Sequence, residues 1–168
     1  REAYGNLLEA YRKKSKQLNL LMSGKDIRAE ELLQESIGKL RKELVDNFAM
    51  KVFPKEWVCG SLLVQQLHSL AEEGKHPSDE LWLQVEKELA LNEENFMEWL
   101  TNCRKDKKLK EREWRMCLLV KMCFLPVEMA VLLVTSKQNV SNMRSRLMKK
   151  IFGQNGRSGE FDILISEL

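Results

Sequence analysis

The stretch from residue 126 to residue 153, "PVEMAVLLVTSKQNVSNMRSRLMKKIFG", contains two helical patterns separated by a break. Pro126 suits the first position of a helix, because the N–H that proline lacks would be unpaired there in any case. An apolar run containing Ala130 follows, and Thr135-Ser136 interrupts it. Ser136 can then cap a second helix with its hydroxyl group. The sequence therefore predicts a short helix, a turn and a longer helix.

The longer helix has an apolar side and a basic side. Its apolar positions follow helical spacing and are Val140, Met143, Leu147 and Ile151. Residues 136–153 contain five Lys and Arg, and no acid occurs between Glu128 and Glu160. The small Ala130 would allow the two helices to cross closely, near a right angle. This order of elements is typical of a helix-turn-helix.

A face that reads duplex DNA needs amides and hydroxyls for base edges, and cations for phosphates. An acid on such a face would repel the phosphates, which explains the absence of carboxylates here. The predicted DNA-binding residues are Lys137, Gln138, Ser141, Asn142, Arg144, Ser145, Arg146, Lys149 and Lys150. The alternative is a helical adaptor that uses the same basic face to bind an acidic protein.

Composition supports an all-α fold. The chain has 168 residues, only three prolines and eight glycines, and abundant Leu, Glu and Lys, which favour helices. Its charge is uneven: residues 1–100 carry −4 and residues 101–168 carry +7. We therefore expect only the second part to meet nucleic acid or another anion.

Three regions are predicted along the chain: a helical linker over 1–50, a helical bundle over 51–108, and the DNA-binding domain over 109–168. The linker is expected as one long helix with a heptad seam, formed by Tyr4, Leu8, Tyr11, Ser15, Leu18 and Met22. The seam predicts either a coiled-coil dimer, which we favour, or a helix packed on its own domain. After Ser23-Gly24 the frame slips by one residue and resumes at Leu33. In the bundle, Ser78 is expected to cap a helix.

No catalytic or metal-binding arrangement is evident, so we expect a non-enzyme without cofactor, metal or small-molecule substrate. The four cysteines form no CxxC pair, which favours free buried thiols in a reducing cytoplasm. His68 could be a phosphoacceptor of a sensor kinase, but Ser69 follows it where an acid is usual, so a surface or core histidine is favoured. The longest uncharged run, residues 57–71, is too short and polar to span a bilayer.

The segment "LKEREWRMCLLVKMCFLPVEMAVLLVTSKQNVSNMRSRLMKKIFG", residues 109–153, resembles the helix-turn-helix of LuxR-type (GerE-like) regulators and, more distantly, the fourth region of sigma factors. The matching residues are Leu109, Glu113, Glu128, Ala130, Ser136, Val140, Arg144, Leu147, Lys150 and Gly153. A closer resemblance, from about Trp82 to the end, is to the C-terminal domain of membrane-anchored Bacteroidetes regulators.

That resemblance implies a transcription regulator whose cytoplasmic fragment binds duplex DNA, as a homodimer, below a membrane-anchored sensor. Residues 1–50 would then be the coiled coil joining the sensor to the DNA-binding end. The sequence departs from the family at two positions. Leu125 stands where the family has a capping Ser, and Val134 stands in the turn, where a β-branched residue resists positive φ.

Overall fold

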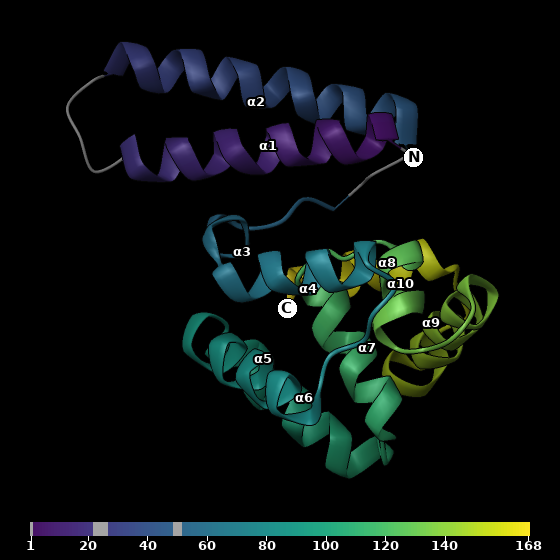
Figure 1. Cartoon of the computed structure of the whole chain (residues 1–168). Helices are drawn as coiled ribbons and strands as arrows, with labels where there is room; N and C mark the ends of the chain where they lie inside the picture. Colours follow the sequence, from purple (N-terminus) through teal and green to yellow (C-terminus); the bar gives the residue numbers. More distant parts are fainter. Residues whose placement is uncertain (1, 22–26, 49–51) are drawn as a thin grey trace. The chain divides into compact units, whose positions relative to one another are not determined.

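The computed structural model describes residues 2–21, 27–48 and 52–168. In these residues the chain forms ten helices and no strand, which confirms the predicted all-α class (Figure 1). The helices are α1 (Glu2–Leu21), α2 (Ile27–Phe48), α3 (Glu56–Gly60), α4 (Leu62–Glu72), α5 (Asp79–Asn92), α6 (Glu94–Lys107), α7 (Glu111–Lys121), α8 (Pro126–Leu132), α9 (Lys137–Phe152) and α10 (Ser158–Glu167). Among the described residues, no helix has both the length and the apolar character needed to cross a bilayer.

The chain divides into two compact units, residues 1–61 and residues 62–168. The first unit contains α1 to α3, and the second contains α4 to α10. From Leu62 onward, helices from the predicted bundle and from the predicted DNA-binding region therefore share one unit. Within it, α4 packs against α8, α5 against α7, and α6 against α9.

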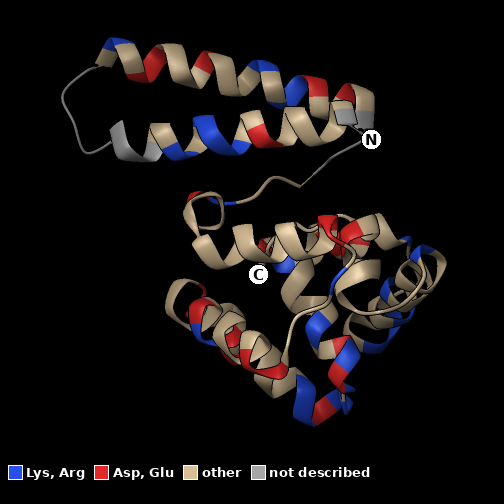
Figure 2. Cartoon of the chain, viewed as in Figure 1, with Lys and Arg blue, Asp and Glu red and all other residues tan. Residues whose placement is uncertain are grey.

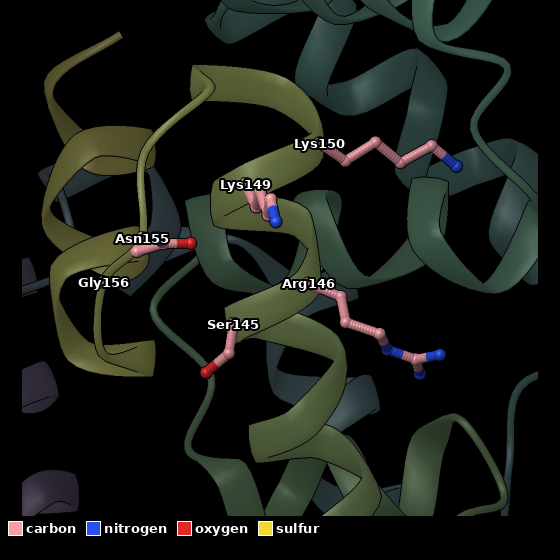
Figure 3. A pocket seen from close by; sticks show the side chains of 6 residues that line it. All are labelled: Ser145, Arg146, Lys149, Lys150, Asn155 and Gly156. Carbon is pink, nitrogen blue, oxygen red and sulfur yellow. The ribbon is translucent and has the colours of Figure 1, made fainter.

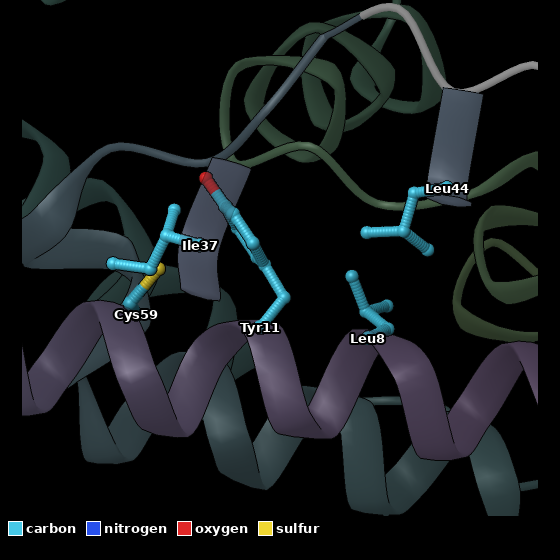
Figure 4. Close-up of a cluster of buried hydrophobic side chains, with 5 residues drawn as sticks. All are labelled: Leu8, Tyr11, Ile37, Leu44 and Cys59. Atoms are coloured by element: carbon cyan, nitrogen blue, oxygen red, sulfur yellow. The ribbon is translucent and has the colours of Figure 1, made fainter. Parts of the chain in front are cut away.

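In the first unit, α1 and α2 lie side by side and antiparallel (Figure 1). The region differs from the single long helix expected, because α1 ends at Leu21 and a separate helix begins at Ile27. The buried core of this unit consists of Leu8, Tyr11, Ile37, Leu44 and Cys59 (Figure 4). The apolar spacing of α1 thus marks a buried face, and the partner of that face is α2 of the same chain.

The heptad seam of α1 supplies most of this contact. Leu8, Tyr11 and Ser15 are buried, while Met22 lies outside the described residues. The Tyr11 ring lies 5.5 Å from the Phe53 ring, and Arg41 Nη2 donates a hydrogen bond of 3.2 Å to Tyr11 Oη. Because α2 covers the seam, pairing of two chains through it would require α2 to move away. That pairing stays a prediction.

In the second unit, α7 is the central helix. It packs against α5, α9 and α10, and Met116, Cys117 and Leu118 are fully buried. Lys121, at the end of α7, is also buried. Its ammonium lies 3.7 Å from Glu93 Oε2 and donates a 3.3 Å hydrogen bond to the Ser166 carbonyl. This buried cation joins α7 to the start of α6 and to α10.

Local sequence signals account for several helix ends. The Leu81 N–H donates to Ser78 Oγ at 3.2 Å, so Ser78 caps α5 as predicted. Pro126 occupies the first turn of α8, also as predicted. Each end uses a residue whose side chain or fixed φ suits the groups left unpaired at a helix terminus.

His68 belongs to the core of the second unit. Its side chain is buried, and Nδ1 pairs with Glu128 of α8. The imidazole also stacks on the Phe124 ring, with the centroids 4.2 Å apart. Of the two positions left open by the sequence, surface or core, His68 therefore occupies the core, where it links α4 to α8.

Candidate nucleic-acid interface

The segment 126–152 has the three parts predicted from the sequence: a short helix α8, a turn, and the longer helix α9. The N–H of Asn139 donates to Ser136 Oγ at 3.1 Å, so Ser136 caps α9 as expected. Val140 and Leu147 are fully buried, and Ala130 is nearly so, as expected for an interface between two packed helices. The inner face of α9 is therefore anchored on α8 and its outer face is left accessible.

The two family departures both have structural consequences. Leu125 stands at the N-cap of α8 and provides no capping side-chain hydrogen bond. Val134, in the turn, has a φ of 53° and is 62% exposed. A β-branched residue in the left-handed region is strained by about 1–2 kcal/mol. The turn before α9 thus has a positive φ at a β-branched residue.

Five predicted residues of α9 present exposed side chains. They are Lys137, Gln138, Asn142, Arg146 and Lys149. Ser141 and Ser145 are half-buried between them. Gln138 Nε2 donates to Asn142 Oδ1 at 3.0 Å, which aligns the two amides one turn apart. This face combines amides, hydroxyls and cations, and among the described residues none of its three cations has an ion-pair partner.

Arg144 does not belong to this face, which corrects the sequence-based assignment. Its side chain is only 6% exposed, and Nη1 donates to Asp162 Oδ2 of α10 at 2.6 Å. Position 144 lies four residues after Val140 and three before Leu147, so helical geometry turns it inward. That spacing was visible in the sequence, but the partner Asp162 was not. Burial raises the pKa of Asp162 to about 6, although the Arg144 guanidinium acts in the opposite direction.

Lys150 has a structural contact as well. Its Nζ donates to Glu113 Oε2 at 2.9 Å and to the Lys108 carbonyl at 3.3 Å. Burial alone would raise the pKa of Glu113, but the hydrogen bonds from Lys150 and from the Lys110 N–H, with their charges, lower it overall. Lys150 therefore joins the end of α9 to the start of α7. Its charge is paired with that of Glu113, and its assignment as a phosphate ligand stays a prediction.

A hollow of about 440 Å³ lies beside the second half of α9 (Figure 3). Its lining consists of Ser145, Arg146, Lys149, Lys150, Asn155 and Gly156. Figure 3 shows the Arg146 and Lys149 side chains extending away from the helix axis, with Asn155 and Gly156 on the loop that leads to α10. Cations, hydroxyl and amide groups around an open hollow suit a phosphate or another oxyanion. Asn155 and Gly156 were not predicted, since only their turn-forming character is visible in the sequence.

Comparisons of the chain with protein-family models, with curated proteins and with solved structures give no match.

Proposed function

We propose that α8, the turn and α9 act as a helix-turn-helix that binds duplex DNA, and that the chain is the DNA-binding end of a bacterial transcription regulator. The observation that carries the proposal is the exposed face of α9. There Gln138 and Asn142 stand beside Lys137, Arg146 and Lys149, and no ion pair within the described residues neutralises these cations. The action is binding rather than catalysis.

The arrangement along α9 favours this function. Gln138, Ser141 and Asn142 lie in the N-terminal half, the part of a recognition helix that usually reaches base edges. Gln and Asn amides can each pair with adenine through one donor and one acceptor. Arg146 and Lys149 lie further along, beside the hollow, where phosphates are the natural ligands. Figure 2 shows the basic residues gathered on α9, while the charged residues of α5 are mainly acidic.

The experiment is a selection of bound duplexes from random genomic fragments, followed by titration of the chain with the enriched duplex across a range of salt concentrations. We expect affinity to fall linearly with salt on logarithmic axes, because bound cations release counterions from DNA. Retention of an acidic protein partner, without salt-sensitive binding to any duplex, would establish the adaptor function instead.

We also propose that two copies bind together, since a single helix-turn-helix reads only a half-site. Two half-sites would lie roughly 34 Å apart, one turn of the duplex. Sedimentation with the selected duplex present should show two chains per duplex. A complex that stays at one chain per full site at saturating protein would contradict the pairing.

A further inference from the structure

Residues 104–112, which we call the connector, comprise the end of α6, the link and the start of α7, and are strongly basic. It contains six Lys and Arg against two acids, a net charge of +4. Its charge pattern alone indicates a solvated link between helices. Figure 2 shows Lys and Arg on this stretch as well as on α9.

Most cations of the connector form no ion pair within the described residues. Arg104 is an exception: its Nη2 donates to Glu111 at 2.6 Å, and its guanidinium lies 4.7 Å from the centre of the Trp114 ring. By contrast, Lys105, Lys107, Lys108 and Arg112 are exposed. In the part of the chain that the structure describes, none of these four forms an ion pair.

The connector lies against the end of α9. The Lys108 carbonyl accepts the hydrogen bond from Lys150 Nζ at 3.3 Å, and Lys150 belongs to the last turn of α9. Lys108 ends α6 in a left-handed conformation with φ 53°. The connector therefore contacts α9 at Lys150, which also lines the hollow.

The number of available cations favours a phosphate-binding surface formed by α9 and the connector together. After Arg144 pairs with Asp162 and Lys150 with Glu113, α9 keeps Lys137, Arg146 and Lys149 for DNA. Each phosphate that a Lys or Arg neutralises adds about 0.9 to the magnitude of the salt slope of binding. The four connector cations that form no ion pair among the described residues would therefore more than double the three that α9 offers to the duplex.

We propose that the α6–α7 connector is a second phosphate-binding segment, which holds the duplex backbone beside the groove that α9 enters. This inference rests on the proposed function. The competing explanation is that Lys105 and Lys107 only stabilise the negative end of the α6 helix dipole, as basic residues in a last turn often do.

The test is a salt titration of the duplex complex with the variants Lys107→Gln and Lys105→Gln/Lys107→Gln. The matched control is Lys87→Gln, because Lys87 is also exposed on a helix and forms no ion pair among the described residues. Each connector lysine removed should lower the magnitude of the salt slope by about 1 and weaken binding about fivefold near physiological salt. Lys87→Gln should change neither quantity. Urea unfolding of each variant shows how much helix stability changes.

Steep salt dependence for the unaltered chain, with the same slope for the connector variants, would overturn the connector assignment and leave the α9 proposal standing. A weakened complex that tracks only a loss of stability would overturn it as well, in favour of the dipole explanation. Absence of salt-dependent binding by the unaltered chain would overturn the proposed function itself.

Discussion

Two pairs of cations lie between residues 144 and 150 of α9, a span of less than two turns, and differ in their surroundings. Arg144 and Lys150 point toward the protein and meet carboxylates, Asp162 and Glu113, at 2.6 Å and 2.9 Å. Arg146 and Lys149 are exposed and border the hollow. Local sequence places all four in one basic run. Only the placement of α7 and α10 separates cations that hold the fold from cations that remain available to a ligand.

The largest expected effect is on stability. Arg144→Ala should lower the free energy of unfolding by about 3 kcal/mol at pH 7, because it leaves the Asp162 carboxylate buried without its partner. Lys149→Ala, on the exposed side of the same helix, should change it by less than about 0.5 kcal/mol. Urea unfolding followed by circular dichroism measures both. Equal stability of the two variants would remove the distinction between the two pairs of cations.

The stability of Arg144→Ala should also depend on pH differently from that of the unaltered chain. Burial already raises the pKa of Asp162 from 3.8 to about 6, and removal of the Arg144 guanidinium would raise it further. Between pH 7 and 5 the folded chain would then hold a proton that the unfolded chain has released. Lowering the pH over this range should therefore stabilise Arg144→Ala more than the unaltered chain. Parallel stability curves for the two proteins would contradict this.

Lys150→Ala should have a smaller effect on stability, about 1–2 kcal/mol, because its pair with Glu113 is only partly buried. Once folded, the variant should keep a salt slope for duplex binding close to that of the unaltered chain, since Glu113 already neutralises Lys150. A slope reduced as much as by Lys149→Ala would show that Lys150 contacts phosphate after all.

Glu113→Gln should cost about 1 kcal/mol at neutral pH, through loss of a charge near both Lys150 and the N-terminus of α7. Because the folded-state pKa of Glu113 is lowered, this stabilisation is present above the ordinary carboxyl pKa near 4.5 and disappears as the pH falls through the folded-state value. The stability gap between Glu113→Gln and the unaltered chain should therefore narrow as the pH falls below the ordinary carboxyl pKa of 4.5. A gap that is constant with pH would indicate that the charge is unimportant.

Much of the second unit follows from local sequence. Ser78, Pro126 and Ser136 mark helix starts because their chemistry suits unpaired terminal N–H groups. These features depend on a few neighbouring residues, so they can be predicted from one sequence.

Features that depend on distant contacts could not be predicted in the same way. The seam of α1 was correct as a buried face, but periodicity does not say whether the partner is a second chain or α2. Arg144 has a helical position typical of the inner face, yet nothing local reveals Asp162 eighteen residues later. The charge pattern of α9 therefore named nine candidates, of which Arg144 is buried and Lys150 is paired with Glu113.

The central claim is that one set of α9 side chains contacts the base edges of DNA and another set binds the DNA phosphates. The most direct test is a salt titration of Asn142→Ala and Lys149→Ala on a selected duplex and on a scrambled one. Asn142→Ala should reduce the preference for the selected duplex by about 1–3 kcal/mol while leaving the salt slope unchanged. Lys149→Ala should weaken binding to both duplexes alike and lower the magnitude of the slope by about 1. Equal losses for both variants on both duplexes, or no loss for either, would contradict the claim.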